Sequence, residues 1–299
     1  MKKLIIAILA LVLLVSCIGC SKSGSYKYAE NYKFTAYNNV ASDEFWTTLS
    51  VNSSEADIGD LLGLIERIFQ RDFGKLNMNW DNLMRITKAM QVAMDVGDME
   101  DAPSDISYGA QFYCATCNTE VGEMYLFPGY FSAPEKRQLQ ALTHVLTRAA
   151  LSTETDESSQ IREGLAEYYT SKFMDNVGYK MEETIYPHQM TAAIWLIAVF
   201  GEDTVVNAAR EDRLEELIDS NTRPGMGAKL EEALNAINLG GDQNRATNAI
   251  YDILANVTVG AGKKLEDVDY LLDYVNDLSK LEGTKIDSSY MRKVLQGKA

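Results

Sequence analysis

The sequence predicts an α+β protein that is predominantly α-helical. Apolar residues recur at helical spacing in most segments after residue 58, whereas alternating apolar and aromatic residues are confined to residues 34–51 and 111–130. The chain has 299 residues, of which 46% are hydrophobic and only 5 are prolines. A chain of this length and composition is expected to form one or two globular domains with a sizeable core.

The N-terminus has the pattern of a bacterial lipoprotein signal peptide. Two lysines precede an apolar run over residues 4–15 that is too short for a comfortable membrane span. Leu14-Val15-Ser16-Cys17 resembles a lipobox, in which the peptide is cut before the cysteine and the cysteine carries the lipid. Cys20 is a second candidate that fits the pattern less well, and a cleaved secretory peptide with an incidental cysteine is the alternative. We therefore expect a signal peptide over residues 1–16 and lipidation at Cys17.

Charge and composition narrow the range of partners. The formal net charge is -15, and loss of the two lysines with the signal peptide would make it -17. Such an acidic surface argues against nucleic acid and against electrostatic docking on anionic lipid. Residues 17–32 are short of apolar residues and are predicted to form a tether between the lipid and the folded body. We expect a protein held at the cell membrane by its N-terminal lipid and facing away from the cytoplasm.

The rest of the chain divides into an N-terminal α/β lobe over residues 33–178 and a helical C-terminal lobe over residues 179–299. Alternation predicts strand or mixed structure over residues 34–51 and a hairpin over residues 111–130, and the carboxylates of residues 95–105 predict a solvated acidic loop. Helices are predicted over residues 58–73, 80–96, 139–148, 162–170, 184–200, 214–220, 229–239, 244–257 and 268–281.

A Cys-x-x-Cys pair, Cys114 and Cys117, falls in the middle of the predicted hairpin. No second pair of this kind completes a tetrahedral zinc site, and a redox-active pair normally begins a helix of a βαβ unit. In an exported chain the pair favours a small structural disulfide that stiffens the turn. Strand pairing that keeps the two sulfurs apart is the alternative.

The most informative stretch lies within residues 139–170. It reads Leu-Gln-Ala-Leu-Thr-His-Val at residues 139–145 and Glu-Gly-Leu-Ala-Glu-Tyr at residues 163–168. Residues four apart lie on one face of a helix, so Gln140 and His144 point the same way, near the edge of a buried apolar stripe. In the second helix Glu163 and Glu167 form a stripe beside the apolar one. The two helices could thus present His144 and Glu163 to each other.

These two segments resemble the metal-bearing helices of gluzincin metallopeptidases. In that family a His-Glu-x-x-His helix supplies two zinc ligands and a general base, and a later helix, often reading Glu-Gly-x-Ala-Glu-Tyr, supplies the third ligand. The resemblance covers residues 113–219 and gives His144 the place of the second histidine and Glu163 that of the third ligand. Gln140 then replaces the first histidine, and Ala141 replaces the glutamate. The resemblance implies a zincin-like, two-lobed architecture with a small N-terminal sheet, a helical C-terminal lobe and a cleft between them.

The chemistry that hydrolysis needs is missing from this motif. A mononuclear zinc site requires three protein ligands and a base that takes the proton of the metal-bound water. Ala141 cannot accept a proton, and the amide oxygen of Gln140 is a poor zinc donor. A register with His144 as the first histidine is worse, because it places the cation Arg148 where a ligand belongs. We therefore expect neither cofactor nor catalysis, and we expect the changes Gln140→His and Ala141→Glu together to create a zinc site.

The sequence favours a lipid-anchored, catalytically inactive metallopeptidase homologue that binds a peptide or cell-envelope partner in the former active-site cleft. One alternative is an atypical zinc metallopeptidase that uses His144, Glu163 and either Glu167 or His188. A purely structural lipoprotein is another alternative. Tyr186 and His188 are the remaining cleft candidates, because a downstream tyrosine or histidine can stabilise the oxyanion in related active peptidases.

Overall fold

The structure is a computed structural model. It describes residues 65–88, 115–118, 123–126, 130, 133–152, 159–179, 181, 184, 186–238, 243–282, 285 and 288–297. The predicted signal peptide and tether, the lipidation candidates Cys17 and Cys20, the strands expected over residues 34–51 and the acidic loop over residues 95–105 lie outside the described residues. Cys114 lies outside them too.

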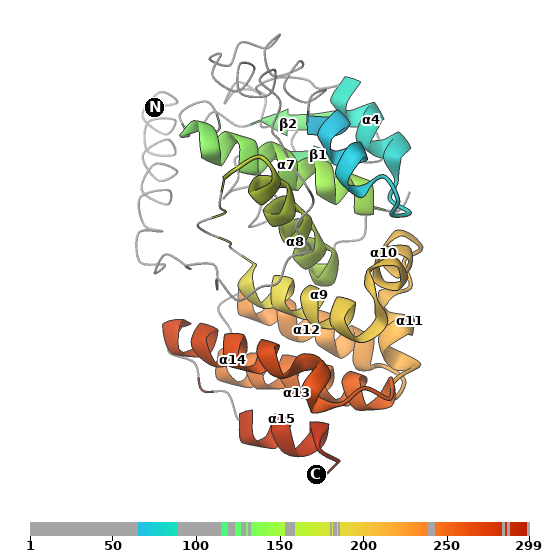
Figure 1. The fold of residues 1–299 in the computed structure, drawn as a ribbon, viewed down its shortest axis with the longest axis vertical. Coiled ribbons are helices and arrows are strands. Elements are labelled where there is room, and N and C mark those ends of the chain that lie inside the picture. The colour runs from blue at the N-terminus through green and yellow to red at the C-terminus, as the bar shows by residue number, and fades with distance from the viewer. Residues whose placement is uncertain are drawn as a thin grey trace, which may run out of the picture.

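The N-terminal elements occupy the upper part of Figure 1. Residues 65–73 are helical, and they are followed by α4 (Trp80–Lys88), β1 (Ala115–Asn118), β2 (Glu123–Leu126), α7 (Glu135–Leu151) and α8 (Gln160–Asn176). Aromatic rings join the first helical segment to α8. Phe69 stacks on Phe173 with 6.2 Å between ring centroids, and Phe73 meets Tyr169 edge to face at 5.2 Å. These ring pairs bury large apolar groups in favourable orientations and hold one side of α8.

The C-terminal elements are helices. They are α9 (Pro187–Phe200), α10 (Glu202–Arg210), α11 (Leu214–Asp219), α12 (Met226–Asn238), α13 (Gln243–Gly260), α14 (Leu265–Glu282) and α15 (Ser288–Leu295). α9 packs against α8, α10, α13 and α14, and its residues are buried nearly all round, as expected for a helix that is apolar on every side. It ends at Gly201, whose φ of 87° favours glycine, and α10 begins at the next residue.

The strands form one short hairpin. β1 and β2 pair antiparallel, with Ala115 opposite Leu126 and Asn118 opposite Glu123, inside the segment where the sequence predicts a hairpin. Among the described residues no further strand joins them. The predicted α+β class with a small N-terminal sheet is therefore wrong. The described part of the chain is predominantly helical, and its strands form this hairpin and no larger sheet. β1 lies against α7, so the hairpin covers a helix instead of extending into a sheet.

Helices α7 to α9 and α11 to α14 lie where the apolar spacing predicts helices, with bounds that differ by a few residues. One cluster of buried apolar side chains extends from Ile65 to Leu295 and so includes elements from both predicted lobes. Within the part of the chain that the structure describes, no single helix has the length and hydropathy of a membrane span. The pair α9 and α10 meets that test only jointly, across a bend of 119°.

The position of α8 matters most for the candidate site, and contacts at its start fix it. The Ser159 side chain caps the helix by accepting a backbone N–H of the first turn. Glu231 of α12 accepts hydrogen bonds from the Ser159 hydroxyl and the Gln160 N–H, both at 2.6 Å. Gly164 lets α9 approach closely, because a Cβ atom there would lie 2.0 Å from the carbonyl oxygen of Gln189. The start of α8 is therefore held by both α12 and α9.

Candidate functional site

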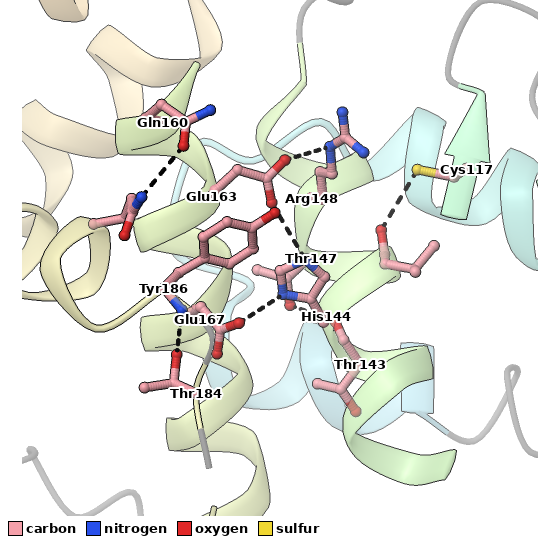
Figure 2. Close-up of polar contacts among 12 residues, drawn as sticks. Cys117, Thr143, His144, Thr147, Arg148, Gln160, Glu163, Glu167, Thr184 and Tyr186 are labelled. Carbon is pink, nitrogen blue, oxygen red and sulfur yellow. Dashed lines mark hydrogen bonds and ion pairs between the residues drawn. The ribbon is translucent and has the colours of Figure 1, made fainter. Parts of the chain in front are cut away.

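Helices α7 and α8 bring one histidine and two glutamates together in the interior. Nε2 of His144 lies 3.3 Å from Oε2 of Glu163, and Nδ1 of His144 lies 3.6 Å from Oε1 of Glu167. The imidazole ring therefore sits between two carboxylates that come from successive turns of α8 (Figure 2). The two helices thus present His144 and Glu163 to each other, as their helical spacing allows. The side chains of His144, Glu163 and Glu167 are 5%, 7% and 0% exposed, so they form a buried polar cluster.

A cation completes the cluster. Nε of Arg148 lies 3.1 Å from Oε1 of Glu163, on the oxygen that His144 does not contact. Burial alone would raise the pKa of Glu163, but Arg148, His144 and Arg162 together hold that pKa below its ordinary value. Arg148 follows His144 by one helical turn, so the spacing that places Gln140 and His144 on one face also places Arg148 there. That spacing could have placed Arg148 on the face of His144 from the sequence, but it does not identify Glu163 as the partner of Arg148.

Tyr186 borders the cluster from the segment just before α9. Its ring stacks near that of His144, with 6.2 Å between centroids and 17° between planes. Figure 2 shows the ring between Glu163 and Glu167 and facing His144. The backbone N–H of Tyr186 donates to the Thr184 hydroxyl at 3.1 Å, which fixes this turn. The structure thus brings Tyr186 to the predicted site residues.

The two positions that differ from the gluzincin motif, Gln140 and Ala141, are buried as well. Gln140 is on α7, one turn before His144, and it is almost fully buried. Ala141 is fully buried and belongs to the main apolar cluster. A glutamate in its place would have to bury a carboxylate, which is costly without a partner. Position 141 therefore serves packing in this chain.

His188 is not part of this cluster. Its Nε2 lies 2.6 Å from Oε2 of Glu282 on α14, and its Nδ1 lies 2.8 Å from the hydroxyl of Tyr251 on α13. Burial raises the pKa of Tyr251 well above its ordinary value. The expectation that His188 lines a common site with His144 is corrected by this geometry. His188 instead joins three C-terminal helices, and sequence spacing gave no signal for Tyr251 or Glu282 as its partners.

The donors present do not fit the zinc site that the resemblance implies. A zinc ion bound at Nε2 of His144 could be reached by Glu163, but Glu167 contacts Nδ1, which faces the opposite side of the ring. Glu167 and Glu163 therefore cannot both bind an ion held by one ring nitrogen, and His188 is engaged elsewhere. Two donors converge where three are needed. Among the described residues no group of three or more His, Cys, Asp or Glu side chains is arranged to hold a metal ion.

Cys117 lies on the hairpin, close to α7. It is buried, and its Sγ atom is 3.8 Å from the carbonyl oxygen of Val145, the residue after His144. The thiol therefore packs against the helix that carries the polar cluster. The disulfide between Cys114 and Cys117 stays a prediction, because Cys114 lies outside the described residues.

No protein-family model, curated protein or solved structure matches this chain.

Proposed function

We propose that this chain is a lipid-anchored, non-catalytic relative of the gluzincin peptidases that binds a peptide or cell-envelope partner. The observation that carries the proposal is the ion pair between Arg148 and Glu163. The ion pair places the permanently charged guanidinium of Arg148 beside the carboxylate that would otherwise be the third zinc ligand. Hydrolysis by a zinc site needs that ligand and an open coordination position, and the cluster supplies neither.

The second support for a non-catalytic role is the absence of a proton acceptor at position 141. The side chain there is a buried alanine within the apolar core. A metal-bound water would have no neighbouring carboxylate at the usual place to take its proton. Glu167 does not replace it, because Glu167 lies on the far nitrogen of the His144 ring.

The hairpin supports a peptide partner. A two-stranded hairpin has backbone edges, and extended peptides bind proteins by adding a strand to such an edge. β1 lies against α7, the helix that carries His144. A peptide that added to this hairpin would run beside the former metal helices. The N-terminal lipid expected at Cys17 would present this surface at the cell membrane.

The test compares metal content, binding and turnover in the same preparation. The lipidated protein in detergent is dialysed, analysed for zinc, and incubated with a mixed peptide library. Bound peptides are identified by mass spectrometry, and new peptide termini report cleavage. We expect peptide binding without stoichiometric zinc and without cleavage. Tight zinc together with cleavage that the Glu163→Gln variant loses would instead establish an atypical zinc peptidase.

The burial of the cluster favours a purely structural role as the second candidate. Glu167 is fully buried and His144 and Glu163 are nearly so, and the contacts between these buried groups link α7 to α8. This candidate predicts that no peptide or envelope component is retained in the binding experiment. Retention of a partner by the wild type, and loss of that partner from a variant with a disrupted hairpin, would decide against it.

A further inference from the structure

His144 and Glu163 have the spacing of two ligands of one metal ion. Their contacting atoms, Nε2 and Oε2, lie 3.3 Å apart. Two donors bound to one tetrahedral zinc ion at about 2.0–2.1 Å lie roughly 3.4 Å from each other. The helices therefore already hold two donors at the separation a zinc ion requires. What the cluster lacks is a third donor and freedom from competing charge.

Position 140 is where a third donor would belong. It is one helical turn before His144, and residues at this spacing share a face of the helix. The Gln140 side chain is almost fully buried, so a residue at this position is directed into the interior. Histidine at position 140 would add an imidazole beside the existing pair without placing a new charge in the apolar core. Ala141 does not need to change for metal binding, because the glutamate that gluzincins have at this position serves proton transfer and does not bind the metal ion.

Arg148 supplies the competing charge. Its guanidinium contacts Glu163 at 3.1 Å, and among the nearby cations it contributes most to lowering the pKa of this carboxyl group. A zinc ion bound to the same carboxylate would lie within a few bond lengths of a group that is always positively charged. In a buried, poorly screened site the repulsion between the two cations is strong.

We infer that Arg148 takes the place of the metal ion as the counter-charge of Glu163 and thereby excludes divalent metal from the cluster. The inference rests on the proposed function, since it treats the cluster as a former metal site. It differs from the expectation that Gln140→His and Ala141→Glu are sufficient for zinc binding. A third ligand alone leaves Arg148 in competition with the ion, and removal of Arg148 is the decisive change.

The test measures zinc affinity by competition with a chromophoric chelator in the full-length protein. The key variants are Gln140→His alone and Gln140→His combined with Arg148→Met, which keeps an unbranched side chain and removes the charge. Arg148→Gln provides a second neutral replacement, and Arg148→Lys retains the positive charge. The matched control combines Gln140→His with Arg210→Met. Arg210 hydrogen-bonds Asn77 at 2.7 Å near the surface, so this variant changes the net charge equally but leaves the cluster intact.

We expect each neutral replacement of Arg148 to tighten zinc binding by on the order of 10- to 100-fold over Gln140→His alone, the range by which neighbours of metal ligands alter metal affinity. The Arg148→Lys and Arg210→Met combinations should bind as weakly as Gln140→His alone. Cobalt substituted for zinc should show the intense visible bands of tetrahedral coordination in the tight variants. Thermal unfolding followed by circular dichroism shows which variants are folded at the temperature of the assay.

Equal zinc affinity in Gln140→His and in its combinations with the neutral replacements, whether tight or immeasurably weak, would overturn the inference. The same holds if Arg210→Met tightens binding as much as Arg148→Met. Tight zinc binding by the wild type would overturn the inference as well. The proposed function alone fails on different data, namely when the wild type retains no peptide or envelope component. Its failure would leave the ranking of the Arg148 variants to decide the role of this residue separately.

Discussion

Gly164→Ala tests the packing that positions the cluster. A Cβ atom at this position would lie 2.0 Å from the carbonyl oxygen of Gln189 and 2.8 Å from the backbone nitrogen of Met190. These are backbone atoms of α9 and cannot rotate away, so the two helices would have to separate. Overpacking of this kind costs about 1–3 kcal/mol, and so short a contact points to the upper end. Alanine's better helix propensity returns about 1 kcal/mol, which leaves a net loss of about 2 kcal/mol.

Thermal and urea unfolding followed by circular dichroism measure this loss. A destabilisation of about 2 kcal/mol corresponds to a melting temperature lower by about 4–8 °C in a protein of this size. Gly201→Ala is the control, because no atom lies within 4 Å of a Cβ there and the cost comes only from its φ of 87°. That cost is about 1–3 kcal/mol, without any change at the cluster. A Gly164→Ala protein as stable as the wild type, or more stable, would refute the close packing of α8 on α9.

Three further predictions concern charge, capping and anchoring. Because the pKa of Glu163 is lowered in the folded protein, its ionisation stabilises the fold above its ordinary pKa of about 4.3 and this contribution is lost as the pH falls through the lowered value. Glu163→Gln should flatten this acid dependence and cost about 3 kcal/mol at pH 7, because it leaves Arg148 without its carboxylate. Urea titrations at several pH values measure this, and a variant whose unfolding free energy changes with pH as steeply as that of the wild type would contradict it. Glu231→Ala should lower the unfolding free energy by about 1–2 kcal/mol through loss of the hydrogen bonds at the start of α8, and an unchanged urea midpoint would contradict this role. Cys17→Ala should abolish incorporation of a fatty-acid label in cells while Cys20→Ala should not, and label that survives in the Cys17→Ala protein would move the anchor to Cys20.

The helices could be predicted because their apolar spacing is a local property of the sequence. The fold class could not be predicted, because an alternating pattern indicates a strand but not the element against which the strand packs. The alternation within residues 111–130 does produce a hairpin, but its β1 strand lies against α7, and no further strand among the described residues joins it. The pattern therefore identified the element correctly and its surroundings wrongly. Neither α10 nor α15 was predicted from apolar spacing; both are short helices of 9 and 8 residues.

In the candidate site, too, the contacts that local spacing determines could be predicted and the others could not. His144 and Glu163 meet because each lies on the inward face of its own helix, which the period of the helix reveals. The partner of Arg148 depends on how far α7 and α8 are rotated about their axes, and no local pattern fixes that rotation. Tyr186 and His188 are only two residues apart, yet they serve different clusters. Tyr186 precedes α9 with a φ of -119° and a ψ of 50°, whereas His188 is within the helix, so their side chains leave the chain in different directions.

Under the proposed relationship to gluzincin peptidases, the ion pair of Arg148 with Glu163 accounts for a cluster that keeps its carboxylates without a metal ion. α8 carries two buried carboxylates on successive turns, and a buried charge that loses its only partner costs several kcal/mol. In a zinc site the ion would neutralise such carboxylates. In this chain one arginine, on the same face of α7 as the histidine, provides a positive charge without a third ligand or an open coordination position. The Arg148 guanidinium thereby offsets the charge of the Glu163 carboxylate with a residue of the chain itself.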